Sequence, residues 1–193
     1  MSKRLALAVL SLLFALVGAA CSNDDPAVDA GSGAGSSSAD HNDADVEFAQ
    51  QMIPHHEGAL EMAKLATEKA SDQKVKDLAG RIEAAQEPEI EQMKGWLEDW
   101  DESVDSGGGM DTGGGSMSGM SEDDMSKLEA ATGAEFDRMF LTSMVEHHKQ
   151  AIEMAETEIA DGQFADAVAL AEQIKSSQEA EVTEMEAMLE QLG

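Results

Sequence analysis

Two pairs of adjacent histidines are the residues of this sequence with the clearest capacity for chemistry. His55-His56 lies in FAQQMIPHHEGALEMA (residues 48–63), and His147-His148 lies in FLTSMVEHHKQAIEMA (residues 140–155). The two segments align without a gap at an offset of 92 residues, and they hold four of the five histidines in the chain. Methionines repeat beside the histidines. Imidazole nitrogen and thioether sulfur suit soft metal ions, so the duplication predicts a metal site.

The candidate ligands come from both copies of the repeat. Helical arithmetic at about 100° per residue places both histidines of each pair within an apolar arc. Met52 precedes His55 by three residues and His56 by four, so either pair can present sulfur and nitrogen to one point. The simpler alternative is that the histidines form hydrogen bonds in a helical core and the methionines fill it. The predicted ligands are Met52, His55, His56, Met62, Met93, Met144, His147, His148, Met154 and Met185.

Two glutamates and two glutamines also repeat at the offset of 92: Gln86 with Gln178, and Glu89 with Glu181. Each falls inside the apolar stripe of its helix. A carboxylate on an apolar face is costly unless it is paired or coordinated. We therefore predict that these four residues are ligands or partners of the histidines. A buried salt bridge to Lys or Arg is the alternative for the glutamates.

Further methionines lie in or beside a Gly-rich stretch that has no core to fill: Met110, Met117, Met120 and Met125. A flexible thioether-rich segment suits capture of cuprous ion. We predict that role for these methionines, with an inert spacer as the alternative.

The ligand types favour copper, especially Cu(I), over zinc and iron. Zinc sites more often use cysteine, and the predicted folded domain has none. A ferritin-like di-iron site needs inward glutamates and Glu-x-x-His motifs; the motif is missing here, and Glu89 and Glu181 are the only inward carboxylates that the pattern offers.

The elements that position these residues are helices. Apolar periodicity predicts amphipathic helices over residues 46–70, 74–100, 134–161 and 164–192. The breaks within each pair are short, so residues 46–100 and 122–193 are each predicted to contain an antiparallel hairpin. A short helix at roughly 122–131 precedes the second hairpin, and residues 101–121 form a Gly- and Met-rich flexible linker. Two copies of one hairpin predict an all-α four-helix bundle with an internal two-fold axis.

Residues 1–21 have the pattern of a lipoprotein-type signal peptide. Lys3 and Arg4 precede an apolar run of 13 residues, and Cys21, the only cysteine, follows small residues. We predict lipidation of Cys21, with ordinary secretion as the alternative. The protein is then exported and anchored to the outer face of the cell membrane or in the periplasm. Residues 22–45 are rich in Gly, Ser, Asp and Ala and are predicted to be a disordered tether.

The charge of the chain restricts its partners. It carries 40 acidic and 12 basic residues, for a formal net charge of −28. Nucleic acid is excluded as an expected partner because phosphate binding needs clustered Lys and Arg. The acidity suits attraction of cations.

The motif as a whole resembles a bacterial family. Met52-x-x-His55-His56 with Met62-Ala63, followed by Gln86-x-x-Glu89-Ile90 and Met93, is similar to the DUF305 family of domains of unknown function. The second copy matches again. The resemblance implies a ferritin-like bundle that is exported and often lipid-anchored. It also implies copper binding, because some family members are implicated in periplasmic copper binding and tolerance.

These observations predict an extracytoplasmic copper-binding lipoprotein. One alternative is an interaction or scaffold bundle without metal, and a second is a carboxylate-rich di-metal enzyme. No catalytic residue is predicted, because the repeat carries no duplicated nucleophile and the chain has no phosphate-cradling loop. The expected partners are a metal ion and the membrane, and no protein partner is predicted.

Overall fold

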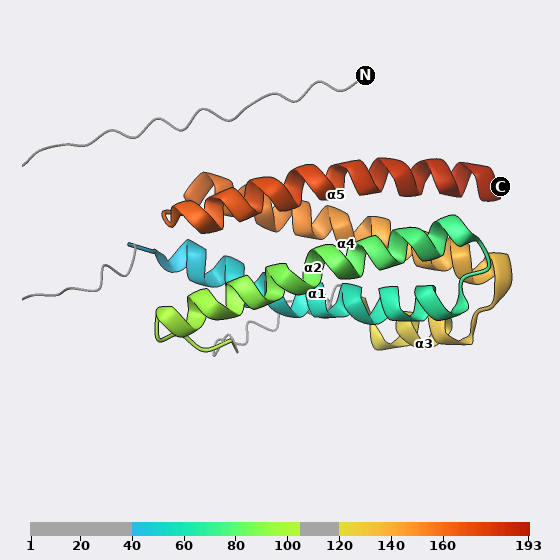
Figure 1. Cartoon of the computed structure of the whole chain (residues 1–193), viewed down its shortest axis with the longest axis horizontal. Coiled ribbons are helices and arrows are strands. Elements are labelled where there is room, and N and C mark those ends of the chain that lie inside the picture. Colours follow the sequence, from blue (N-terminus) through green and yellow to red (C-terminus); the bar gives the residue numbers. More distant parts are fainter. Residues whose placement is uncertain (1–39, 105–119) are drawn as a thin grey trace, which may run out of the picture. The chain divides into compact units, whose positions relative to one another are not determined.

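The computed structural model describes residues 40–104 and 120–193 and forms five α-helices (Figure 1). The helices are α1 (Asp43–Lys69), α2 (Gln73–Asp99), α3 (Glu122–Ala130), α4 (Gly133–Asp161) and α5 (Ala165–Leu192). The all-α fold class is therefore confirmed. The predicted signal peptide with Cys21, most of the tether, and Met110 and Met117 lie outside the described residues. Within the described ranges, no helix is long and apolar enough to cross a membrane.

The helix starts differ from the sequence prediction by more than one residue only at α1, which begins three residues before residue 46. Asn42 caps this helix, since its side chain accepts hydrogen bonds from the Ala44 and Asp45 backbone N–H groups. The Asp45 carboxylate in turn accepts a hydrogen bond from the Asn42 N–H, which completes a capping box. Pro54 lies inside α1 and does not start it. The last residues of the predicted tether thus belong to the helical domain.

The two hairpins pack so that α1 lies against α4. One apolar cluster combines the end of α1 and start of α2 with the start of α4 and end of α5. The other cluster combines the opposite ends of the same four helices. Helices α1 and α4 are therefore antiparallel, and α2 ends at the opposite end of the bundle from the start of α4. Ferritin-like bundles likewise have hairpins related by one long connection.

Two buried aspartates tie the hairpins to each other. Asp45 in α1 accepts hydrogen bonds from Gln163 N and Phe164 N, in the turn between α4 and α5. Asp137 in α4 accepts from Ser71 N and Asp72 N, in the turn between α1 and α2. These aspartates are also 92 residues apart, so the internal repeat contained this signal and the sequence analysis missed it. Each hairpin thus caps the turn of the other.

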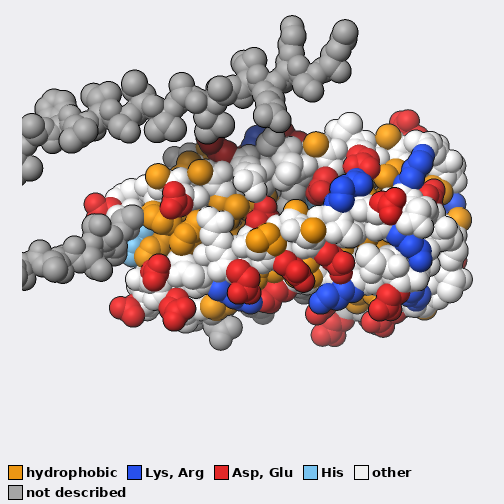
Figure 2. Space-filling view, in the orientation of Figure 1, with side chains coloured by type: hydrophobic (Ala, Val, Ile, Leu, Met, Phe, Trp, Pro, Cys, Tyr) orange, Lys and Arg blue, Asp and Glu red, His pale blue; other side chains and the backbone are white. Residues whose placement is uncertain are grey.

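Charge is distributed unequally along the bundle. Residues 40–51, 95–104 and 153–172, which meet at the end where α1 begins, contain no Lys or Arg. The opposite end carries most of the basic residues, including Lys69, Lys76 and Arg81. Figure 2 shows most of the visible Lys and Arg side chains in the right-hand half of the molecule, where α1 ends. The end that holds the α4–α5 turn is therefore strongly acidic.

Candidate metal centre

A layer of histidines crosses the middle of the bundle. In α1, His55 and His56 lie between Ile53 of one apolar cluster and Ala59 of the other, and His147 and His148 occupy the equivalent place in α4. All four are buried, with His55 the most exposed at 4%. Gln86, Glu89, Gln178 and Glu181 complete the layer from α2 and α5. The predicted polar set is thus one continuous layer.

His55 and His147 meet at the centre of this layer. Their ring centroids are 3.7 Å apart, and the ring planes are inclined by 37°. Because the two residues are equivalent in the repeat, the internal two-fold axis passes between them. The Nε2 atom of His147 donates to the His55 backbone oxygen at 2.9 Å, since a carbonyl only accepts. There is no reciprocal bond, so the two copies differ at the axis.

The outer histidines are each held by a glutamate of their own hairpin. His56 Nε2 lies 2.8 Å from Glu89 Oε2, and His148 Nε2 lies 2.7 Å from Glu181 Oε2. The glutamates therefore pair with histidine, and neither forms a salt bridge to Lys or Arg among the described residues. A carboxylate accepts the Nε2 proton and leaves the lone pair on Nδ1. Metal-binding histidines commonly have this carboxylate partner.

The remaining ring nitrogens of the four histidines have no hydrogen-bond partner among the described residues. Among the described residues, Nδ1 of His56, His147 and His148 and both ring nitrogens of His55 lack a hydrogen bond. The side-chain oxygens of Gln86 and Gln178 are also buried without a partner. Buried polar atoms nearly always have a partner, so this concentration indicates a bound ion or water. The donor set fits a metal ion that accepts imidazole nitrogen.

Burial keeps the central histidines neutral. Desolvation and the neighbouring His56 lower the pKa of His55 to about 3. Desolvation and His55 lower the pKa of His147 to about 2. Both rings therefore carry a free lone pair at neutral pH, which is the form that binds metals.

The predicted methionine ligands lie on both sides of the histidine layer. Met52, Met93 and Met154 belong to one cluster, and Met62, Met144 and Met185 belong to the other. The offset of 92 exchanges these two sets, as the two-fold axis requires. Five of the six are fully buried, and Met154 is half-buried. Met120 and Met125 pack, partly buried, against the cluster that contains Met62.

Imidazoles and carboxylates alone do not form a site. No group of three or more His, Cys, Asp or Glu side chains in residues 40–104 and 120–193 is arranged to hold a metal ion. An ion held in this layer by three or more ligands would need thioether or amide groups in addition to histidine.

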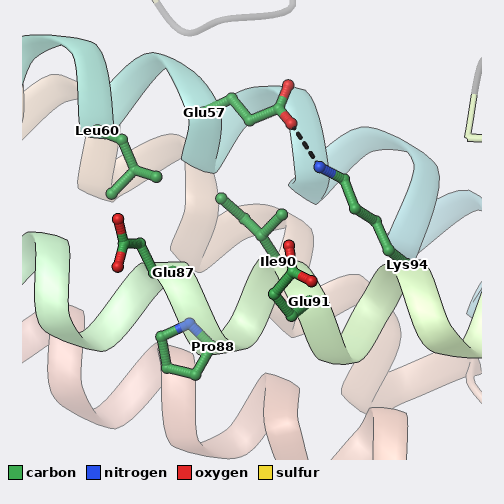
Figure 3. Close-up of a pocket in the computed structure, with 7 residues that line it drawn as sticks. All are labelled: Glu57, Leu60, Glu87, Pro88, Ile90, Glu91 and Lys94. Atoms are coloured by element: carbon green, nitrogen blue, oxygen red, sulfur yellow. Dashed lines mark hydrogen bonds and ion pairs between the residues drawn. The ribbon is translucent and has the colours of Figure 1, made fainter.

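A surface groove between α1 and α2 does not contain the predicted ligands (Figure 3). Glu57 and Lys94 form an ion pair of 2.8 Å across it, drawn as the dashed line. In the second hairpin the equivalent residues are Lys149 and Glu186, which pair at 3.8 Å with the charges exchanged. This groove is therefore part of the contact between paired helices and is separate from the histidine layer.

Comparison with known proteins now identifies the family. The family model for the domain of unknown function DUF305 matches residues 45–189. The chain belongs to the DUF305 family. The resemblance in the His-His and Met motif is thereby confirmed. No curated protein matches the sequence.

Solved structures of the family share the fold. A candidate secreted DUF305 protein from Streptomyces coelicolor is 30% identical with a TM-score of 0.72, over 78% of this chain and 94% of that chain. CopM in the Cu(II)-bound form is 33% identical with a TM-score of 0.68, over 77% and 97%. CopM in the Cu(I)-bound form is 31% identical with a TM-score of 0.64, over 76% and 96%. The family thus includes a protein crystallised with copper.

Proposed function

We propose that this DUF305 protein binds and sequesters copper outside the cytoplasm, with the histidine layer as the centre of its site. The observation that carries the proposal is the set of unpartnered Nδ1 atoms on His56, His147 and His148, whose Nε2 atoms are engaged by carboxylate or carbonyl oxygen. Only a ligand that accepts a lone pair or donates a proton completes such a set. The crystallisation of CopM with Cu(II), Cu(I) and Ag supports a metal as that ligand.

Copper(I) suits the neighbouring groups best. It accepts imidazole and thioether ligands at low coordination number, and methionines border the histidine layer on both sides. In this proposal the histidines and methionines bind the ion, while Glu89 and Glu181 orient their histidines and increase the basicity of Nδ1. Gln86 and Gln178 offer amide oxygen to the same layer. Iron and zinc fit this donor set less well.

The test is a Cu(I) titration of residues 22–193 against a coloured competing chelator. Wild-type protein is expected to remove copper from the chelator, and a variant with alanine at His55, His56, His147 and His148 is expected to remove far less. Circular dichroism of both proteins checks that the helices remain. Equal binding by the two proteins contradicts the histidine site.

A bundle that acts without metal remains the second candidate, because the glutamates already satisfy two of the histidines. A ligand that binds only the native state must stabilise it. Melting temperature with and without Cu(I) separates the candidates: an increase supports copper binding, and no change supports an interaction module.

Export and lipid anchoring at Cys21 complete the proposal. The signal-like residues 1–21 and the Streptomyces relative support an extracytoplasmic location. We expect labelled fatty acid to be incorporated into the wild-type protein and not into Cys21→Ser.

Met110, Met117, Met120 and Met125 are proposed to assist capture, and joint replacement by leucine is expected to slow copper uptake without loss of the final stoichiometry.

A further inference from the structure

A second groove runs between α1 and α4 at the acidic end of the bundle. Nine residues line it: Ala44, Glu47, Phe48 and Gln51 from α1, and Gln150, Glu153, Met154, Thr157 and Glu158 from α4. Three of these carry carboxyl groups, two carry amides and one carries a thioether. The groove is therefore chemically suited to a cation.

One wall of the groove holds a buried acid with no donor. Glu158 is 1% exposed, and both of its side-chain oxygens lack a hydrogen-bond donor among the described residues. Its counterpart in the first copy is Ala66, so the group is not required by the repeat. A buried carboxyl group that accepts no hydrogen bond is costly unless a polar guest enters beside it.

The groove leads to the histidine layer. Gln150 lines the groove, and its side chain also lies beside the His55 ring. Among the described residues, His55 is the one paired histidine with no close hydrogen-bond partner at either ring nitrogen, and the weaker interaction with Gln150 acts to raise its pKa. The least constrained histidine therefore lies beside a residue that lines this surface opening.

The face related by the two-fold axis is closed. Leu65 and Met62, the counterparts of Thr157 and Met154, belong to the apolar cluster that also includes Leu128 of α3. Met62 is fully buried, whereas Met154 is half-buried. Helix α3 packs on α4, and among residues 40–104 and 120–193 no equivalent helix packs on α1. Of the two equivalent faces, as far as the described residues show, the one that holds Met154 and Thr157 is polar and grooved, and the one that holds Met62 and Leu65 is apolar.

The negative charge around the opening also favours a cation in this groove. The segments that form this end of the bundle contain no Lys or Arg, as described above. A cleft with a single sign of charge raises the local concentration of the opposite ion and its rate of association. A cation is therefore drawn to this end of the molecule.

We infer that the α1–α4 groove is the entry site through which a soft monovalent cation reaches His55, with Met154 as the first thioether ligand and Glu153 drawing the cation to the opening. This inference rests on the proposed copper function and assigns its route. The closed face would then leave a single path in and out.

A matched pair of charge reversals tests the attraction. Glu153 and Glu61 occupy equivalent, exposed positions in the two copies, but only Glu153 lines the groove. We expect Glu153→Lys to slow Cu(I) transfer from a chelator about fivefold at low salt, because it replaces a negative charge by a positive charge at the opening. Glu61→Lys is expected to slow it less than twofold. Equal slowing overturns the route, because it shows that only net charge matters.

Obstruction of the groove provides the second test. Thr157→Trp places a large ring in the opening, and Thr183→Trp on the exposed face of α5 is the control. A blocked path slows uptake and release alike, so we expect both rates to fall about tenfold in Thr157→Trp with the dissociation constant within twofold of wild type. Unchanged rates overturn the inference. Absence of Cu(I) binding by the wild-type protein overturns both the route and the proposed function, and is distinct from these results.

Discussion

The substitution Glu158→Gln tests how the buried acid pair couples stability to pH. Burial and the neighbouring Asp45 carboxylate raise the pKa of Glu158 to about 8, from a usual value of 4.5. Burial also acts on Asp45, but backbone donors from Asn42 and Phe164 outweigh it and lower the pKa of Asp45. The pair therefore holds a proton on Glu158, which can donate it to Asp45.

The direction of the pH dependence follows from the number of protons bound by the native and unfolded states. Between pH 4.5 and about 8 the native state binds the Glu158 proton and the unfolded state does not, so stability falls as pH rises. The full shift corresponds to about 5 kcal/mol at about 1.4 kcal/mol for each pH unit. Since an ionised Glu158 can recruit water from the adjoining groove, we expect about 2 kcal/mol to be observed.

Chemical denaturation of wild type and Glu158→Gln at pH 5 and pH 9 measures this effect. The two proteins are expected to agree within about 0.5 kcal/mol at pH 5, and the variant is expected to be about 2 kcal/mol more stable at pH 9. The lowered pKa values of His55 and His147 make stability rise toward neutral pH in both proteins, so the difference isolates Glu158. Parallel profiles, or an equal effect of Glu153→Gln on the exposed face of α4, would refute the reasoning.

Three further predictions concern other contacts. Joint Glu89→Gln and Glu181→Gln substitution is expected to weaken Cu(I) binding about 10- to 100-fold in chelator competition, since both histidines lose their carboxylate partners; unchanged affinity contradicts the assigned role. Asp137→Ala leaves the N–H donors of the α1–α2 turn unpaired and is expected to lower the free energy of unfolding by about 2–4 kcal/mol in denaturant. A loss below about 1 kcal/mol would show that these hydrogen bonds do not hold the two hairpins together. Gly162→Ala places a Cβ 2.3 Å from Glu158 Oε1 and is expected to lower stability by about 1–3 kcal/mol, and a neutral result would show that Glu158 can move aside.

The internal repeat explains why the site is divided between the hairpins. A helix pair cannot bury its own apolar face, so the second copy covers the first and brings equivalent residues to the axis. His55 and His147 meet for this reason. The differences between the copies then have functional meaning in our proposals. Glu158 stands at the position equivalent to Ala66, and within the described part of the chain α3 covers one of the two equivalent faces.

The residue pattern was sufficient to predict the helices, their pairing into hairpins and the residues that face the interior. Apolar periodicity depends on the local geometry of a helix, so it identified the face that buries Met52 and His55. The offset of 92 gave the duplicated hairpin, and the equivalent Asp45 and Asp137 were available in the same alignment. The start of α1 was placed too late because the Asn42 cap precedes the first apolar residue.

Contacts between residues distant in sequence were decided only by the tertiary structure. The sequence could place His56 and Glu89 on inward faces, but their bond depends on the relative height of α1 and α2. In the same way, packing of α1 on α4 determined that His147 donates to the His55 backbone and that neither ring nitrogen of His55 has a close partner among the described residues. Helical periodicity determines which face a side chain occupies, and only the packing of one helix on another determines which atom it meets.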